Sequence, residues 1–416
     1  MKKIGKIITL TAFTCSMVFG QETAMDLIEK SVTQHPSVLA KNATLFASEY
    51  EKDSAFYQFF ATPSVSYERK YNKTDEESTV FKLSQPLFVG GKIKYGYDRA
   101  KIAMSIANLN IQDLQDTLAV QMVEALYNYR SALKRVEVQK ETLAKLQNYQ
   151  EMIQKRSSSG ISPESDIYLI ESRLSYEKNQ LTTFETAKDK AKRMIDYLLS
   201  EKIDENTLNS IVNSNFENKM ITILENGEKG FIETSLLRNP ELKRYHNEIL
   251  KSNKELEIEK STLYPSVYAN WINSDGDNIE NDTYVGISVE LKLGAGLSTY
   301  SNIQAAKQKT LAFKSEYESK KEDLARAYQD ELEEYTQTKT KIIELENMIK
   351  NNTMVVDSYN RLFILGKKSW LDLLNSEREL TQYKLNYYDT KSYLELVPLR
   401  FAIRTGELSL KNEENN

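Results

Sequence analysis

The chain has 416 residues, a formal net charge of −5, and only 7 prolines and 14 glycines. Because Pro and Gly interrupt helices, and Lys, Glu, Leu and Ala are abundant, this composition favours long helices over ordinary globular packing. The basic residues are not in excess and are spread along the chain, which argues against nucleic acid as a partner.

Residues 1–20, MKKIGKIITLTAFTCSMVFG, have the three parts of a secretory signal peptide. A basic start precedes an apolar stretch and a small-residue cleavage site after Gly20, so we expect an exported protein. A lipoprotein site at Cys15 is the alternative, but Phe13 and Thr14 fit that pattern poorly. Because no later run of 18 apolar residues follows, we expect either a soluble exported protein or one that crosses a membrane as β-strands.

The two halves of the chain repeat one another at an offset of 202 to 206 residues. His35-Pro36 is echoed by Asn239-Pro240, and the stretch GISPESD from Gly160 is echoed by GKKSWLD from Gly366. A nearly constant offset indicates one duplicated unit. We place the first repeat at 21–200 and the second at 231–407, joined by an inter-repeat segment at 201–230 and followed by a polar tail at 408–416.

Each repeat is predicted to begin with a helix, near 24–58 and 230–262, that ends where a proline starts a strand. Strands are expected near 61–90 and 264–293. The clearest strand, TYVGISVELKL from Thr283, alternates apolar and polar residues. This period-two pattern predicts one apolar and one polar face. In the partner strand, Val267, Ala269 and Trp271 supply the apolar face.

A long helix follows each hairpin, near 94–155 and 298–363. In the first, apolar residues recur every seven positions with Gln139 as the exception, at Ile111, Leu118, Ala125, Ala132, Leu146 and Ile153. The last helix repeats in the same way from Leu373 to Phe401. A seven-residue repeat is typical of supercoiled helix pairs rather than of a globular core. For residues 201–230, a plain connector and a small segment packed on the helices both stay open.

The predicted fold class is α+β, mainly α, with a duplicated helix–hairpin–helix–helix unit. Four strands of about ten residues match an outer-membrane span, but four strands cannot close, and an open sheet edge is not viable in lipid. At least about eight strands are needed for a spanning barrel. The chains must therefore pool their hairpins, as eight strands in a dimer or twelve in a trimer.

The sequence resembles the TolC family of outer-membrane efflux and secretion proteins. The likeness is carried by the Pro-Ser-Val strand starts at Pro63 and Pro265, the glycine-bounded strand exits, and the paired Gly-x5-Asp tips. The resemblance implies a homotrimer with a twelve-stranded barrel in outer-membrane lipid and a helical coiled-coil tunnel through the periplasm. It also implies docking to a periplasmic adaptor and to an inner-membrane transporter, either an ABC or a proton-driven one.

The helix tips are the predicted functional site. Gly160 and Gly366 suit helix C-caps, and Ser162 or Ser369 can cap the helix that follows. By resemblance, Asp372 contributes to a ring of negative charge at a narrowed entrance, and Asn375 stands where some family members carry a second acid.

The resemblance also implies a latch that holds the helix pairs together, formed by Lys368 and Asp166. Lys provides a point charge instead of the two-pronged grip of Arg, so we expect a loose latch. Phe363, which stands where some members carry an aromatic hydroxyl, cannot add a hydrogen bond.

An enzyme has little support in the sequence. His35 and His246 lack the partner spacing of a metal site or a catalytic triad. The acidic loop from Ser274 lacks the glycine of a calcium-binding loop, and Val89-Gly-Gly-Lys lacks phosphate-loop spacing. We therefore expect no catalytic residues, no cofactor and no metal.

The predicted function is a passive outer-membrane exit duct of a three-part export system. Its cargo is a secreted protein, as in type I secretion, or small molecules, as in multidrug efflux. The C-terminal run from Arg361 looks most like type I members, but the sequence names no cargo. The rival hypothesis is a periplasmic coiled-coil scaffold or adaptor that never enters a membrane.

Overall fold

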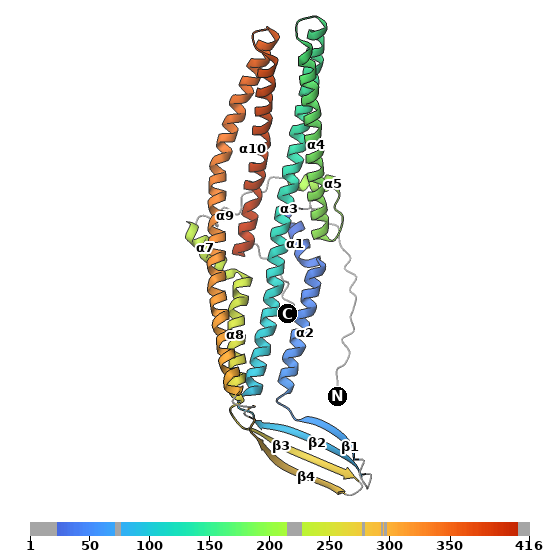
Figure 1. Ribbon diagram of the computed structural model, residues 1–416, viewed down its shortest axis with the longest axis vertical. Helices are drawn as coiled ribbons and strands as arrows, with labels where there is room; N and C mark the ends of the chain where they lie inside the picture. The colour runs from blue at the N-terminus through green and yellow to red at the C-terminus, as the bar shows by residue number, and fades with distance from the viewer. Residues whose placement is uncertain are drawn as a thin grey trace.

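The computed structural model describes residues 23–70, 76–213, 227–276, 279–292, 294 and 298–406. The predicted signal peptide, the polar tail and residues 214–226 of the inter-repeat segment lie outside this range. Figure 1 shows an elongated molecule, with two helical hairpins at one end and a four-stranded sheet at the other. The chain is therefore mainly helical with a small antiparallel sheet, as predicted.

Both halves have the same order of elements. The first contains α1 (Ala24–Gln34), α2 (Pro36–Tyr57), β1 (Thr62–Lys70), β2 (Glu76–Phe88), α3 (Lys92–Ser158) and α4 (Glu164–Leu199). The second contains α7 (Gly227–Arg238), α8 (Pro240–Ser261), β3 (Ser266–Gly276), β4 (Ile279–Glu290), α9 (Ser298–Ile364) and α10 (Trp370–Thr405). Helix α5 (Glu205–Asn213) lies between the halves.

The helix before each hairpin is broken, where one continuous helix was predicted. The breaks fall at His35 and Asn239, because each precedes a proline that starts the next helix. A residue before proline is pushed out of the helical region, and proline itself suits the first helical position. The side chains of His35 and Asn239 cap the new helices by accepting backbone N–H groups, for Asn239 from Leu242 at 2.8 Å.

The lower helices form a layer in the order α2, α3, α8, α9, with each helix contacting the next. The strands follow the same order, β1, β2, β3, β4, in one antiparallel sheet. Each strand is joined to one helix of the layer, as Figure 1 shows. The helices and the strands are thus arranged side by side in the same order. In the helix layer and in the sheet, one outer element belongs to the first half of the chain and the other to the second half.

The largest apolar core lies at mid-height, around α3 and α9. Helix α5 buries Leu208, Ile211 and Val212 in it, and Phe231 of α7 packs on Phe401 of α10 with ring centroids 4.9 Å apart. The described part of the inter-repeat segment is therefore packed on the helices, which decides between the two alternatives for residues 205–213.

The seven-residue repeat of α3 is buried throughout, as expected for a coiled-coil seam. Gln139, the one polar residue of the repeat, is also part of this buried seam. It is 1 % exposed and donates a hydrogen bond to the Glu177 carbonyl oxygen of α4 at 3.0 Å. Glu177 is itself buried and pairs with Arg173 at 2.6 Å. A polar side chain with partners tolerates burial and specifies the pairing of helices.

Two carboxylates of α3, Asp113 and Asp116, are partly buried in the helix layer. Burial raises the pKa of Asp116 to about 7, and the neighbouring Asp113 adds to the rise while Lys243 of α8 opposes it. Burial and Glu241 also raise the pKa of Asp113. An isolated Asp has a pKa of about 3.9, so folding takes up protons here near neutral pH.

Replacing Asp116 by Asn should stabilise the protein more at pH 8 than at pH 5. Because the folded pKa is raised, the wild-type carboxylate lowers the free energy of unfolding as pH rises from about 4 to about 7. Thermal unfolding followed by circular dichroism should show a gain in Tm that is larger at pH 8 by roughly 2 °C or more. Asp330→Asn, at an exposed position of α9, is the control. Equal gains for Asp116→Asn at the two pH values would contradict the assignment.

Candidate functional site: the sheet face and the helix tips

The sheet has one apolar and one polar face, as predicted from the alternation. Residues opposite one another in antiparallel strands share a face. Leu83, Trp271 and Val285 are aligned across β2, β3 and β4, and the next row holds Ser84, Asn270 and Gly286. The register therefore places the aliphatic residues Val285, Ile287 and Val289 of β4 on the side of Trp271.

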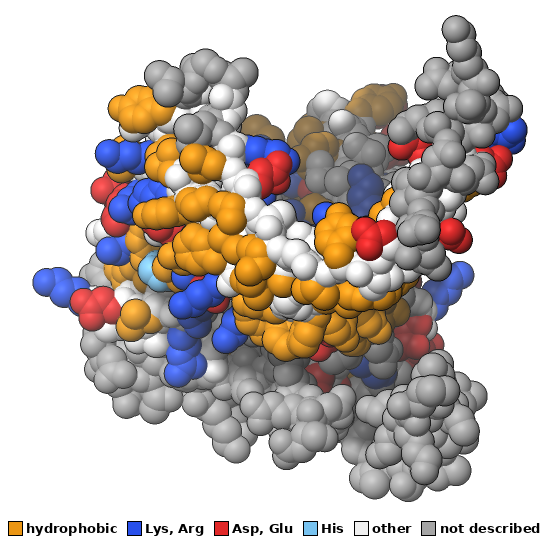
Figure 2. Space-filling model, turned by 90° about the horizontal axis from the view of Figure 1, so that it is seen from below, with side chains coloured by type: hydrophobic (Ala, Val, Ile, Leu, Met, Phe, Trp, Pro, Cys, Tyr) orange, Lys and Arg blue, Asp and Glu red, His pale blue; other side chains and the backbone are white. Residues whose placement is uncertain are grey.

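The apolar face is exposed to solvent in the single chain. Val285 is 76 % exposed and Ile287 is 71 % exposed, values normal for charged surface residues but not for aliphatic side chains in water. Figure 2, seen from the sheet end, shows hydrophobic side chains gathered in a continuous band. A patch of this kind marks a membrane or protein contact.

The opposite face carries a hydrogen-bonded polar row. Ser84 donates to Asn270 at 2.8 Å, and the Asn270 amide donates to Ser288 at 2.8 Å. Asn270 is only 5 % exposed, so its amide is well satisfied. This face is therefore polar, and its row of side chains is hydrogen-bonded across three strands.

Aromatic side chains gather where α2 meets β1. Phe56, Phe59 and Phe60 form ring contacts with one another or with Tyr97 of α3, at centroid distances of 5.5 to 6.4 Å. Phe56 and Phe60 are about half exposed. Exposed aromatics at one end of an apolar strand band are typical of the boundary between lipid and water.

Both ends of the layer lack a neighbour within the described chain. Strands β1 and β4 are the sheet edges. Above β1, α2 carries an exposed apolar stripe, hereafter the α2 stripe, formed by Leu39, Phe46, Tyr50 and Tyr57. Their spacing of seven, four and seven residues puts them on one side of the helix. Above β4, α9 exposes Tyr300 and Leu311.

The two helix tips close through the same backbone turn, as predicted for Gly160 and Gly366. Both glycines have φ of +71°, a conformation that costs L-residues energy. At the first tip the Ile161 N–H donates to the Arg156 carbonyl at 2.8 Å, and at the second the Lys367 N–H donates to the Leu362 carbonyl at 2.9 Å. These bonds define Schellman caps at both tips.

The helix starts after the tips differ between the repeats. Ser369 caps α10 by accepting the Asp372 backbone N–H at 3.2 Å, as predicted. Ser162 does not cap α4, because Pro163 occupies the cap position. The Ser162 hydroxyl instead accepts a hydrogen bond from Arg156 at 3.4 Å.

The structure joins Lys368 to Asp372. Their side chains lie 3.3 Å apart, and the ammonium also lies 4.4 Å from the centre of the Tyr359 ring. Hydrogen bonds from Ser369 and Lys368 lower the pKa of Asp372, which stays negatively charged at neutral pH. Asp372 is 44 % exposed as a side chain, and Asn375 is exposed one turn further along the helix.

Within the described chain, Lys368 makes no ion pair with Asp166. Asp166 lies in the first turn of α4, where burial raises the pKa of its carboxyl and the charge of Arg156 lowers it. A latch between Lys368 and Asp166 therefore stays a prediction, now for contacts between chains.

Arg156 and a shared apolar core lie at the tips, and neither was predicted from the sequence. Residues from all four upper helices meet in this core, including Ile153, Ile170, Phe363 and Trp370. Arg156 crosses from α3 to α9, where its guanidinium lies 4.8 Å from the Phe363 ring centre. Its position four residues before Gly160 indicated that Arg156 lies near the first tip. Its contact with Phe363 of α9 could not be predicted from the spacing of residues along the sequence.

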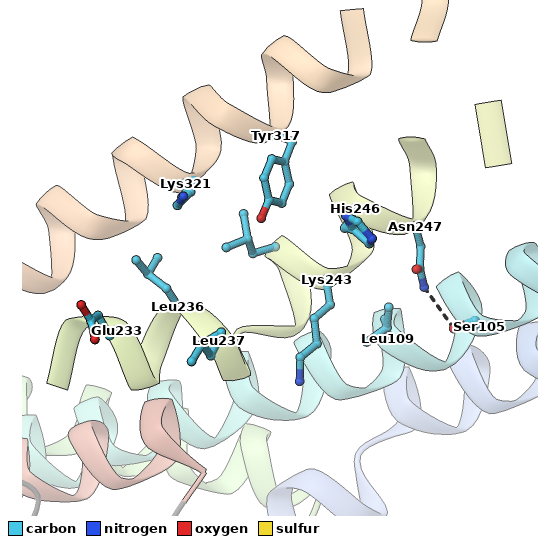
Figure 3. A pocket seen from close by; sticks show the side chains of 11 residues that line it. Ser105, Leu109, Glu233, Leu236, Leu237, Lys243, His246, Asn247, Tyr317 and Lys321 are labelled. Atoms are coloured by element: carbon cyan, nitrogen blue, oxygen red, sulfur yellow. Dashed lines mark hydrogen bonds between the residues drawn. The ribbon is translucent and has the colours of Figure 1, made fainter. Parts of the chain in front are cut away.

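A groove of about 750 Å³ opens between α3, α7, α8 and α9. Figure 3 shows Leu236 and Leu237 of α7 beside Lys243 and His246 of α8, with Tyr317 of α9 reaching over them. His246 packs edge-on to Tyr317, and no described hydrogen bond links its ring to a nucleophile or a carboxylate. The groove is lined by apolar and polar side chains of these four helices.

The described residues contain no group of three His, Cys, Asp or Glu side chains placed to hold a metal ion. None of the described helices is both long and apolar enough to cross a membrane.

Residues 27–199 match the family model of the outer membrane efflux proteins. These residues span the first repeat, from α1 to the end of α4. Among curated proteins, no sequence matches the chain.

Solved outer-membrane channels share the whole fold. The outer-membrane channel OprN is 16 % identical with a TM-score of 0.79, over 92 % of this chain and 90 % of that one. The outer membrane protein VceC from Vibrio cholerae is 13 % identical with a TM-score of 0.77, over 92 % and 96 %. The outer membrane channel CmeC from Campylobacter jejuni gives 13 % and 0.77, over 92 % and 86 %.

The chain thus shares its fold, long helices with a sheet at one end, with solved outer-membrane channels. The resemblance expected from the sequence is confirmed, by the family model for residues 27–199 and by the solved channel structures for both halves of the chain.

Proposed function

We propose that the protein is the outer-membrane exit duct of a tripartite export system, a passive conduit without chemistry of its own. The family match in the first repeat and the shared fold of outer-membrane channels support this proposal. The observation that carries it is the sheet. Its four strands expose aliphatic side chains on one face, hold a polar row on the other and leave two edges unpaired.

Lipid is the environment that suits this sheet. Aliphatic side chains that are 67–76 % exposed, such as Val285, Ile287 and Val289, are unfavourable in water and stable in hydrocarbon. Unpaired edge groups are unfavourable in lipid at several kcal/mol each, so the edges must be paired with other copies. A periplasmic scaffold, the rival hypothesis, has no need of an outward apolar strand face.

Ring closure pairs β4 of one chain with β1 of the next. The two edges are antiparallel in one chain, so the join continues the alternating order of the sheet. The same join brings α9 of one copy beside α2 of the next, where the α2 stripe meets Tyr300 and Leu311. Three chains make twelve strands, which leave room for a water-filled bore lined by the polar row.

The helix tips form the periplasmic entrance of this duct. Copies of Asp372 around the symmetry axis place negative charge at the entrance, which favours cations. A periplasmic adaptor engages the tips, and an ABC or proton-driven transporter of the inner membrane supplies the energy. The cargo is a protein, as in type I secretion, or a small molecule, as in multidrug efflux.

Replacing Ile287 by Arg should prevent assembly in the outer membrane. The substitution puts a charge on the lipid-facing side of β4, at a cost of about 2–4 kcal/mol per chain near the bilayer midplane. Membrane fractionation with alkaline washing should find the wild type in the detergent-soluble membrane fraction and the variant depleted from it.

Ser288→Arg is the matched control, because it places the same charge one residue later on the polar face. This variant should assemble and lower the cation conductance of the channel in planar bilayers. Release of the wild type by alkaline washing without detergent would contradict the proposal of an outer-membrane duct and favour the periplasmic scaffold. The same conclusion would follow if the purified wild type formed no channels in bilayers.

Replacing Phe46 by Asp should weaken the oligomer. Phe46 is 60 % exposed in the single chain and lies in the middle of the α2 stripe, so a carboxylate there is desolvated when α9 of the next copy packs on it. Native mass spectrometry of the detergent-extracted protein should show a trimer for the wild type and mostly monomer for the variant. Thr44→Asp, on another side of α2, should stay trimeric. If the Phe46→Asp protein were also trimeric, the proposed contact between the α2 stripe and α9 of the next copy would be excluded.

Charge changes at the second tip should alter ion selectivity. Asp372→Asn should lower the ratio of cation to anion permeability, measured as a reversal potential in bilayers, and Asn375→Asp should raise it by adding a second acid. Asp166→Ala tests the latch, because Lys368 is already held by Asp372 within its own chain. A rise in closed-state conductance supports a link between chains, and unchanged conductance removes it.

A further inference from the structure

A small pocket lies among the upper helices, lined by side chains of α3, α4 and α10. Its volume is about 290 Å³, at the lower end of the range for small-ligand sites, roughly 300–1,000 Å³. Three of its lining side chains are arginines, namely Arg135 of α3, Arg173 of α4 and Arg378 of α10. The three helices therefore bring three guanidinium groups to one small space.

Two of these arginines already have carboxylate partners. The Arg135 Nε atom donates to Asp389 of α10 at 2.9 Å, and Arg173 pairs with Glu177 of its own helix at 2.6 Å. Arg378 is exposed and forms no ion pair with any described residue. The pocket and its partners thus combine three positive groups with two negative ones, and the unpaired charge is that of Arg378.

Aromatic rings hold the two paired arginines in place. The Arg135 guanidinium lies 5.4 Å from the centre of the Phe184 ring, and the Arg173 guanidinium lies 5.1 Å from the centre of the Tyr176 ring. A guanidinium that stacks on an aromatic face is restrained in its orientation. The same rings, together with Leu385, give the pocket apolar walls beside its charged groups.

Buried polar side chains form the floor of the pocket. Gln139 is 1 % exposed and Glu177 is 3 % exposed. Gln139 donates to the carboxylate of Glu177 as well as to its carbonyl oxygen, and Arg173 holds the same carboxylate. Because Glu177 is occupied by these partners, the charge of Arg378 stays available for a ligand.

From these features we propose that the pocket binds small aromatic carboxylates. The ligand carboxylate pairs with Arg378, whose planar guanidinium presents two parallel donors to the two oxygens. The ligand ring lies against the apolar walls, where burial of aromatic surface adds hydrophobic stabilisation. The excess positive charge selects an anion over a cation, and the walls select an organic anion over an inorganic one.

The pocket lies on the concave side of the helix layer. Helix α3 contacts both α4 and α10, and all three helices line the pocket on the side of Arg135 and Gln139. Glu137, Lys140 and Ala144, at a spacing of three and four residues, are exposed on the opposite side of α3. When such a layer closes into a ring, its concave side faces the bore.

A ligand in this pocket therefore lies in the wall of the duct. Small aromatic acids are then the cargo class that the wall recognises. This placement rests on the proposed function, whereas the binding site itself is a property of the single chain.

Binding is tested with 2-naphthoate and the full-length protein extracted in an uncharged maltoside detergent. Isothermal titration calorimetry should give a Kd for 2-naphthoate at least about fivefold lower than for acetate or inorganic phosphate, because only 2-naphthoate buries aromatic surface. Benzylammonium, which has a ring and the opposite charge, should not compete. Equal affinities for 2-naphthoate and phosphate, or competition by benzylammonium, would overturn the assignment.

Replacing Arg378 by Gln should raise the Kd for 2-naphthoate about tenfold or more, because the carboxylate loses its charged donor. Arg378→Lys keeps the charge without the two parallel donors, so its Kd should fall between those of the wild type and Arg378→Gln. Since Arg378 is exposed and has no ion pair among the described residues, both variants should unfold at the wild-type Tm.

Arg193→Gln is the matched control. It removes the same charge from an exposed position of α4 outside the pocket, so it should leave the Kd unchanged. An unchanged Kd in Arg378→Gln, or an equal loss of affinity in Arg193→Gln, would contradict binding at this pocket.

Bilayer conductance separates the pocket from the proposed function. If 2-naphthoate lowers the conductance of the wild type but not of Arg378→Gln, both proposals are supported. If 2-naphthoate binding depends on Arg378 while no protein conducts, the pocket stands and the duct fails. If the wild type conducts but does not bind 2-naphthoate, the duct stands and the pocket fails. Binding through Arg378 without any effect on wild-type conductance would overturn the location of the pocket in the bore.

Discussion

The structure depends on a sheet that cannot be complete in one chain. Within the described chain, β1 and β4 each pair with another strand on one side only, and the aliphatic face is exposed, so water disfavours the face and lipid disfavours the edges. Closing a ring of copies satisfies both conditions at once. The helix layer repeats the strand order, so any ring formed by the sheet continues upward through α2, α3, α8 and α9.

The fold was predictable from patterns that have a period. Alternation in the strand from Thr283 identified its apolar face, and the seven-residue repeat identified the long helices, because both patterns follow from where side chains point. The break between α1 and α2 at His35 was not predicted, although Pro36 is a signal for the start of a new helix. The residues on both sides of the break favour helix, which hid it. Gln139 was interpreted as an interruption, because its partner Glu177 comes from another helix and no spacing connects them.

At the helix tips, the backbone turns and the local Ser369 cap were predictable, but the contacts between helices were not. Repetition of Gly160 at Gly366 revealed two equivalent turns, because a left-handed residue is needed at the end of each helix. The side-chain contacts were not predictable, since they depend on which groups from distant helices meet. Lys368 was assigned to Asp166 by resemblance, whereas in the chain it lies beside Asp372, four residues later and on the same side of the helix.

The two repeats have the same backbone turn at their tips, at Gly160 and Gly366, but the side chains around the turns differ. The second tip holds an exposed polar group of Lys368, Ser369 and Asp372, whereas the first sends Arg156 inward onto the aromatic side chains of the other hairpin. The two repeats therefore share a backbone turn but differ in their side-chain contacts: Arg156 contacts the other hairpin, whereas Asp372 pairs with Lys368 and Ser369 of its own tip.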